Sequence, residues 1–134
     1  MHANALRPFL SQSARSTAEV RAKGLVIALR IAAKHTNARG FAHEGVLSTL
    51  ADIALGYAVE SAAGESVSLV TASLALDYAG TAKLGDWIET NIDIQKIGAR
   101  LAFANAYLCV GSTRIVRASA VFLVLERPQA TARP

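Results

Sequence analysis

The sequence predicts an α+β fold in which an antiparallel sheet of five to six strands wraps around one long central helix. Residues 46–63 form a long, mostly apolar segment without proline, which is typical of a buried helix. The chain after this segment alternates between apolar and polar residues, and glycine-containing pairs at 98–99 and 111–112 interrupt it at hairpin spacing. Tight turns join antiparallel strands, and such a sheet can bury a single apolar helix only by curling around it.

Length and composition indicate one folded domain. The chain has 134 residues, of which 52% are hydrophobic and 18% are charged, a balance typical of a globular protein and not of a disordered one. We expect a single domain over residues 1–134, with its core from about residue 24 to residue 125. The hydrophobic share is high for a small monomer, and hidden subunit interfaces would explain it.

Charge and cysteine content argue against several classes of partner. The net charge is only +4, aromatic residues make up 6% of the chain, and no run of Lys and Arg is interleaved with aromatics, so a nucleic-acid partner is not expected. The single Cys109 cannot form an intramolecular disulfide or a zinc site alone, and we expect an inert core thiol. Residues 1–20 lack the apolar region of a secretory signal, and Asp52, Gly56 and Glu60 interrupt the apolar run that could span a membrane. We therefore expect a cytoplasmic protein without a metal.

The N-terminal third contains two weaker elements and the start of the main helix. A short helix is predicted around Ala5–Ser11, and Gly24–Ala32 predicts a first strand, although its alanines leave a helix open. The main helix is expected over Val46–Ala63, where Gly64 is placed to cap its end.

The strand after the helix, expected over Glu65–Tyr78, is apolar on both faces. Val70, Leu74 and Leu76 share one face, and the opposite face carries Val67, Leu69 and Ala75. If such a strand formed an unpaired edge of the sheet, it would promote aggregation. Pairing with the same strand of a second copy across a two-fold axis would remove the edge. The strand therefore predicts a protein that is not a monomer.

Three more strands are expected after that strand, and tight turns are expected to join all four strands in chain order. Trp87–Ile97 alternates clearly, with Ile88, Ile92 and Ile94 facing inward and polar residues between them. The two glycine-containing pairs then enclose another strand and lead to a final strand over about Thr113–Leu125.

One segment combines groups that are suited to chemistry. Residues 35–45 form a polar loop that contains Asn37, His43 and two glycines, and this loop leads directly into the apolar helix. Asp52 follows in the second turn of the helix, where a buried ionised carboxylate is either strongly compensated or functional. Free backbone N–H groups at the helix start can hold an oxyanion. A base close to oxyanion donors is what acyl transfer requires.

This segment resembles the hotdog-fold acyl-CoA thioesterases of the PaaI-like, phenylacetate-degradation type. Those enzymes carry an Asn, a His-Gly-Gly turn and a helix with a Leu-Ala-Asp triplet, and four residues match in order and spacing: Asn37, His43, Gly45 and Asp52. The likeness covers most of residues 24–124 and implies the hotdog fold. Glu44 is a departure, because the family usually has its first glycine there.

The resemblance implies thioester hydrolysis centred on one carboxylate. Asp52 would either activate water or attack the thioester carbonyl directly, and the sequence leaves both routes open. Backbone N–H groups near Glu44 and Gly45 would stabilise the oxyanion, because a glutamate offers the same N–H as a glycine. From periodicity alone, however, Asp52 could simply belong to the more solvent-exposed face of the helix.

Four other candidate residues also have a structural alternative. Asn37 matches a family amide that contacts the thioester or the attacking water, although a loop Asn forms turns by itself. Thr71 aligns with a family Ser or Thr that positions the water, although threonine is common in strands. His43 would orient the substrate or hydrogen-bond the loop. Glu44 would suit the helix dipole, or it would act as a second carboxylate beside Asp52.

The substrate and the assembly follow from the same resemblance. Related enzymes hold the CoA phosphates with basic residues at the edges of loops. Exposed charges at such positions can also serve only solubility. The basic residues at loop edges in this chain are Arg39, Lys83, Lys96 and Arg100. Four apolar residues are expected to line the acyl pocket: Phe41, Leu55, Tyr57 and Phe103. We expect an acyl-CoA substrate and no cofactor, since hydrolysis needs only water activation and charge stabilisation. Related enzymes share each site across a homodimer, which can pair into a homotetramer.

Two alternatives remain open. A non-catalytic acyl-CoA or acyl-carrier binding protein would keep the fold without turnover, and Glu44 is the feature that favours it. A hotdog dehydratase acting on hydroxyacyl thioesters ranks third, because its usual His–Asp arrangement differs from this pattern.

Overall fold

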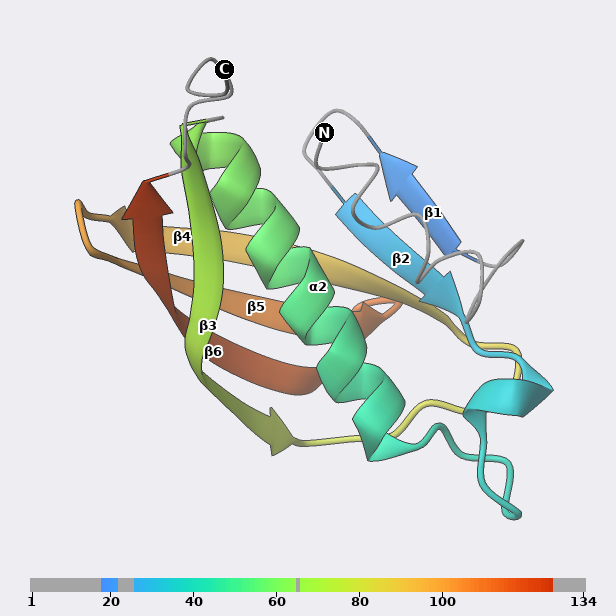
Figure 1. Cartoon of the computed structure of the whole chain (residues 1–134). Helices are drawn as coiled ribbons and strands as arrows, with labels where there is room; N and C mark the ends of the chain where they lie inside the picture. The colour runs from blue at the N-terminus through green and yellow to red at the C-terminus, as the bar shows by residue number, and fades with distance from the viewer. Residues whose placement is uncertain (1–17, 22–25, 65, 127–134) are drawn as a thin grey trace, which may run out of the picture.

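The computed structural model describes residues 18–21, 26–64 and 66–126 and shows a six-stranded antiparallel sheet around one long helix (Figure 1). The elements in chain order are β1 (Ala18–Arg21), β2 (Val26–Arg30), the 3-10 helix η2 (Ala33–His35), α2 (Glu44–Ala63), β3 (Val67–Tyr78), β4 (Trp87–Ile97), β5 (Leu101–Val110) and β6 (Thr113–Glu126). The strand order is β1-β2-β4-β5-β6-β3, and every neighbouring pair is antiparallel. The predicted α+β class is therefore confirmed, and so is the hotdog architecture.

Helix α2 is buried on one side only. Its sheet-facing side carries Leu47, Leu50, Ala51, Ala54, Leu55, Ala58 and Val59. The predicted cap is confirmed, because Gly64 adopts a φ of 102° and its N–H donates to the carbonyl of Glu60 (3.1 Å). By length and composition α2 could also cross a membrane, but the core helix of a soluble protein passes the same test.

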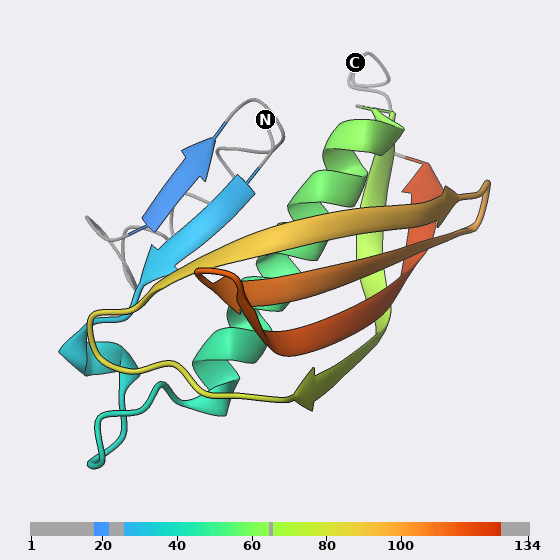
Figure 2. The same ribbon diagram turned by 180° about the vertical axis from the view of Figure 1, so that it is seen from behind.

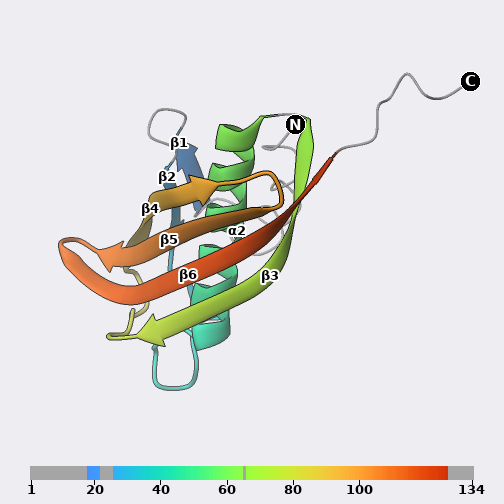
Figure 3. The same ribbon diagram turned by 90° about the vertical axis from the view of Figure 1, so that its left-hand side faces the viewer.

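Small side chains let the sheet approach α2 closely. The inner face of β5 and β6 carries a series of alanines, all almost fully buried, which are Ala102, Ala104, Ala106, Ala118 and Ala120. Larger residues such as Ile88 and Phe122 are also buried in the core. Seen from behind and from the side, β4, β5 and β6 curve around the helix (Figures 2 and 3). Close packing of this kind needs small residues where backbones approach.

One predicted neighbour relation is wrong. The sequence predicts that the strand after the helix joins Trp87–Ile97 through a tight turn, but β3 pairs with β6 and not with β4. Residues 79–86 instead connect β3, an edge strand of the sheet, to β4. On the way Ala42 donates its N–H to the carbonyl of Ala82 (2.8 Å), and Phe41 forms an isolated bridge with Lys83. This connection therefore borders the loop that precedes α2.

A β-bulge changes the faces of β3. The register against β6 shifts between Thr71 and Ser73. Odd-numbered residues therefore face the core before Ala72, and even-numbered residues face it after Ala72. Leu69, Leu74 and Leu76 consequently all pack against the core. The prediction that Leu69 lies opposite Leu74 and Leu76 is therefore wrong.

The two ends of the strand order are β1 and β3. The sequence does not predict strand β1, and the strand expected over Gly24–Ala32 is the second one, β2. The helix expected around Ala5–Ser11 lies outside the described residues. The long β3 pairs along one side with β6, and within the described chain no strand pairs with its other side.

Candidate active site at the start of helix α2

Asn37 organises the loop before α2. Its Oδ1 accepts the N–H groups of Arg39 (2.9 Å) and Phe41 (3.2 Å). Its own N–H donates to the carbonyl of Phe41 (2.9 Å), and its carbonyl accepts the N–H of Gly40 (3.0 Å). In the single chain the Asn37 side-chain oxygen therefore holds a turn, the structural alternative considered from the sequence.

Two histidines fix the ends of this loop. His35 is only 4% exposed, and its Nδ1 accepts the N–H of Ala32 (2.8 Å). The carbonyl of His35 accepts the N–H of His43 (2.9 Å), which is the N-cap of α2. The His43 side chain is exposed and forms no cap hydrogen bond. The backbone of His43 thus holds the loop, while its imidazole lies at the helix entrance.

The first two helical residues offer backbone donors. The N–H groups of Val46 and Leu47 donate to the carbonyl of His43 (3.0 and 3.3 Å), whereas those of Glu44 and Gly45 donate to no described residue. A Cβ added to Gly45 would meet no atom within 4 Å, so the space beside this residue is open. Together with the helix dipole, two unpaired N–H groups beside open space form an anion-binding geometry.

Glu44 is compatible with this geometry. It is the first residue of α2, so the position has helical backbone and does not require glycine. Its carbonyl accepts the hydroxyl of Tyr78 (3.2 Å), and its carboxylate forms no hydrogen bond or ion pair with a described residue. Residue type at this position therefore changes the charge near the donors without removing a donor.

Asp52 lies further along the same helix. It is half-buried, so the expectation of a buried carboxylate is wrong: the buried side of α2 carries Leu50, Ala51 and Ala54, and Asp52 lies beside it. Its Oδ1 accepts the hydroxyl of Thr71 from β3 (3.2 Å). The structure therefore brings together two of the predicted site residues from distant parts of the sequence. Asp52 follows Gly45 by seven residues, which corresponds to roughly 10 Å along the helix axis.

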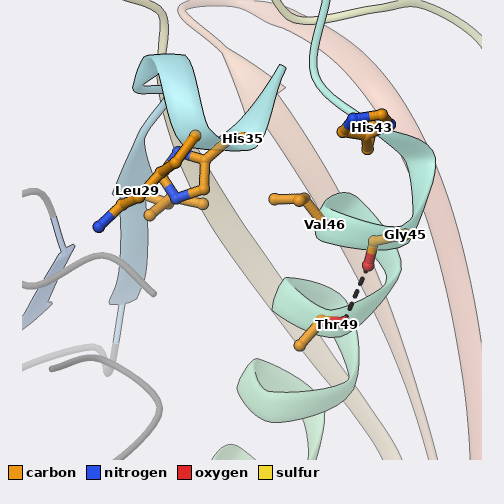
Figure 4. A pocket seen from close by; sticks show the side chains of 7 residues that line it. Leu29, His35, His43, Gly45, Val46 and Thr49 are labelled. Carbon is orange, nitrogen blue, oxygen red and sulfur yellow. Dashed lines mark hydrogen bonds between the residues drawn. The ribbon is translucent and has the colours of Figure 1, made fainter. Parts of the chain in front are cut away.

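Two pockets flank the start of α2, and His43 lines both. The β2–α2 pocket, about 460 Å³, is lined by Leu29, Lys34, His35, His43, Gly45, Val46 and Thr49 (Figure 4). The loop pocket, about 510 Å³, is lined by Asn37, Arg39, Phe41, Ala42, His43, Glu44, Leu47, Gly80 and Thr81. Asp52 and Thr71 line neither of these two pockets.

The expected pocket walls are only partly correct. Phe41 lines the loop pocket, but Leu55 is fully buried in the core and Phe103 is exposed on the sheet. Tyr57 packs against the core. Sequence reasoning missed Val46 as a wall, although its place in the first turn, one residue after Gly45, was the signal that could have revealed it.

The four basic residues fall into two groups. Arg39 lines the loop pocket, and Lys83 lies beside it through its bridge with Phe41. Lys96 and Arg100 lie at the β4–β5 hairpin, at the other end of the molecule from the loop before α2 (Figure 1). All four are exposed. Within one chain only Arg39 and Lys83 are near the helix start.

Known proteins are similar to this chain in sequence and in fold. The family described as the thioesterase superfamily matches residues 39–116. A Pseudomonas aeruginosa protein named "Putative esterase PA0474" is 48% identical over 98 residues, which cover 73% of this chain and 73% of that protein.

Solved structures extend the comparison at lower identity. A Streptococcus pneumoniae protein described as a hypothetical thioesterase and solved with coenzyme A superposes with a TM-score of 0.79 at 21% identity, covering 92% of this chain and 99% of the other. The BH2602 protein of Bacillus halodurans, solved with CoA, gives a TM-score of 0.77 at 20% identity, with 92% and 82% covered. A mutant of the phenylacetic acid degradation protein PaaI from Thermus thermophilus gives 0.75 at 23% identity, with 87% and 97% covered. These likenesses confirm the hotdog fold and the structural resemblance to PaaI-like proteins.

Proposed function

The chain belongs to the thioesterase superfamily, and from this membership we propose that it hydrolyses the thioester bond of an acyl- or aryl-acyl-CoA to the free acid and CoA. Hydrolase activity in general is supported by the family and by the relative named as an esterase. The observation that carries the proposal is the pair of unpaired N–H groups at Glu44 and Gly45 beside open space. Such donors stabilise the negative charge that develops on a carbonyl oxygen under attack.

In the proposed reaction the thioester carbonyl oxygen accepts hydrogen bonds from Glu44 and Gly45. As a general base, Asp52 takes a proton from water while the water oxygen attacks the carbonyl carbon, and Thr71 holds the carboxylate in position through its hydroxyl. The tetrahedral intermediate then collapses, the C–S bond breaks, and the CoA thiolate leaves and takes up the proton that Asp52 had accepted from water, which restores the carboxylate. Direct attack by Asp52 would give an acyl-enzyme anhydride that water then cleaves.

The separation between Gly45 and Asp52 supports a site shared between two subunits. The attacking group, which is either the Asp52 carboxylate or the water that it activates, and an oxyanion donor must both lie about 3 Å from the same carbonyl group, while Gly45 and Asp52 are roughly 10 Å apart along one helix. Asp52 is bonded to the strand β3, whose outer side has no partner strand in the described chain. We therefore propose a homodimer paired along β3, in which Asp52 of the partner subunit faces the helix start of the first.

Two dimers would pair through a different surface. Exposed apolar side chains lie on the outer face of β3, β5 and β6, and this face would be buried in a homotetramer: Val70, Leu101, Phe103, Leu123 and Leu125.

The CoA moiety is proposed to bind on the loop side. The solved proteins from Streptococcus pneumoniae and Bacillus halodurans hold coenzyme A, and we extend this ligand to the present chain. Arg39 and Lys83 border the helix start and can pair with phosphate oxygens. Lys96 and Arg100 of the same subunit lie too far away to share this role. We further propose a cytoplasmic enzyme that needs no cofactor.

Substitution of Asp52 tests the proposal. Asp52→Asn keeps the shape but removes the ionisable group, so kcat should fall at least ~10²-fold, in the range for loss of a general base. The measurement is release of CoA thiol from a panel of acyl-CoA esters, detected with a thiol reagent. Glu44→Gln is the matched control, because it neutralises the other nearby carboxylate while keeping the helix, and its kcat should stay within about threefold of wild type. A folded Asp52→Asn enzyme with most of its activity would refute the assignment.

A non-catalytic acyl-CoA binding protein is the second candidate. The unpaired carboxylate of Glu44 favours it, because a negative charge next to the oxyanion donors opposes charge development on the carbonyl. Calorimetric binding of acyl-CoA esters without thiol release in the same panel would establish this alternative.

A further inference from the structure

The wall of the β2–α2 pocket is more apolar than that of the loop pocket, although Lys34, His35, His43 and Thr49 also line it. Its walls include Leu29 and Val46, and Leu29 is 3% exposed. The Thr49 hydroxyl donates to the carbonyl of Gly45 (2.8 Å) (Figure 4). Lys34 also lines this pocket but is exposed, so its carbon stem can cover apolar surface while the ammonium group stays in water. The loop pocket instead contains Asn37, Arg39 and Thr81.

The two pockets meet at the proposed oxyanion donors. Gly45 lines the β2–α2 pocket and Glu44 lines the loop pocket, while His43 belongs to both. A thioester whose carbonyl oxygen accepts the N–H groups of Glu44 and Gly45 therefore has one pocket on each side. One arm of the thioester is the apolar acyl group and the other is the polar pantetheine chain, which ends in phosphates.

We infer that the β2–α2 pocket binds the acyl group and that Val46 limits the size of acyl group it accepts, an inference that rests on the proposed function. Burial of the acyl group against Leu29 and Val46 is favourable because it removes apolar surface from water. The reverse orientation would place the acyl group against the more polar wall of the loop pocket, beside Asn37 and Arg39. The difference in polarity therefore favours the first orientation, whereas one basic side chain, Lys34 or Arg39, lines each pocket.

The volume of the pocket indicates the substrate class. A cavity of about 150 Å³ suffices to hold benzene, so a pocket of about 460 Å³ accepts an aromatic ring or a medium-length chain. Val46 projects from the first turn of α2 across this space towards His35, which forms the opposite wall (Figure 4). The side chain at position 46 therefore sets how far an acyl group extends between α2 and η2.

Opposite changes of size at position 46 test the inference. Val46 is half-buried, so Val46→Phe fills the pocket without entering the core. It should lower kcat/KM for octanoyl-CoA and phenylacetyl-CoA at least ~10-fold more than for acetyl-CoA, a difference typical of steric specificity in apolar pockets. Val46→Ala should shift the same ratio towards the larger esters. Thr81→Phe in the loop pocket is the matched control and should lower activity for all esters equally.

A binding experiment separates this inference from the proposed hydrolysis. S-octyl-CoA and S-ethyl-CoA are thioethers that cannot be hydrolysed, so the ratio of their affinities reports on the pocket alone. Isothermal titration should show that Val46→Phe selectively weakens S-octyl-CoA, even if the wild-type protein releases no thiol from any ester. The inference is overturned if Thr81→Phe and not Val46→Phe changes the octyl-to-ethyl ratio, if both variants leave it unchanged, or if neither thioether binds.

Discussion

Thr71 connects β3 to the proposed base. Its hydroxyl donates to Oδ1 of Asp52 (3.2 Å), so this side chain faces α2, while the neighbouring Val70 is exposed. Thr71→Val keeps the shape and removes one hydrogen bond to a charged group near the surface. We expect kcat to fall about tenfold with little change in KM, which corresponds to about 1.4 kcal/mol.

The conservative variant distinguishes positioning from packing. Thr71→Ser restores the hydroxyl but removes a methyl group, so it should recover most of the lost kcat. Steady-state kinetics on one acyl-CoA ester compare the three proteins. If serine is as poor as valine, the methyl contact and not the hydrogen bond explains the effect.

At Asn37 the sequence could not separate two roles that the structure shows to be compatible. The side-chain oxygen is engaged by the N–H groups of Arg39 and Phe41, so Asn37 shapes the loop that positions the helix start. Its side-chain N–H groups donate to no described residue. The same side chain can therefore hold the loop and still offer a donor to a substrate.

At the scale of elements, the two ends of α2 respond oppositely to the same substitution. Gly64 caps the helix with φ 102° and ψ 177°, a region that is almost restricted to glycine. An added Cβ would meet no atom within 4 Å, so the effect of Gly64→Ala comes from the backbone alone. We expect it to lower the free energy of unfolding by about 1 to 3 kcal/mol, measured by urea denaturation.

Gly45→Ala is the matched control for this prediction. Position 45 is helical and equally open, so alanine should leave stability unchanged or raise it by up to about 1 kcal/mol. If both substitutions lowered the free energy of unfolding equally, the positive φ of Gly64 would not be the cause of the loss.

Local signals explain which elements the sequence predicts well. The predicted strand Trp87–Ile97 has the bounds of β4, because its alternation of inward isoleucines is clear within the segment itself. The Gly64 cap and the turns at 98–99 and 111–112 are local in the same way. These features depend on residues close together in the sequence, which is why they can be read there.

The errors arise where distant parts of the chain decide the structure. The pairing of β3 with β6 depends on how residues 79–86 pass the helix, and nothing local distinguishes that path from a hairpin. The bulge at Ala72 is visible only against the partner strand. In the site, resemblance suggests that Asp52 and Thr71 act together, while the β2–α2 pocket depends on packing between separate elements.

At the scale of the whole molecule, the proposed dimer rests on the open side of β3 and on the position of Asp52. The helix start supplies donors and Asp52 supplies the carboxylate, yet within one subunit they are roughly 10 Å apart. If each site combines the loop of one subunit with Asp52 of the partner subunit, two different inactive variants can complement each other. Asp52→Asn removes the carboxylate. Asn37→Ala removes the side-chain oxygen that accepts the N–H groups of Arg39 and Phe41, and so it disrupts the loop.

A mixture of the Asp52→Asn and Asn37→Ala proteins should therefore regain activity. In a hybrid dimer one site combines two intact parts and the other combines two damaged ones, so random exchange of equal amounts should restore about a quarter of wild-type activity. The measurement is thiol release after brief subunit exchange, with exchange verified by native mass spectrometry and each variant alone as control. An active monomer in light scattering, or no recovery despite verified hybrids, would contradict the shared site, because each subunit would then carry its own complete set of groups.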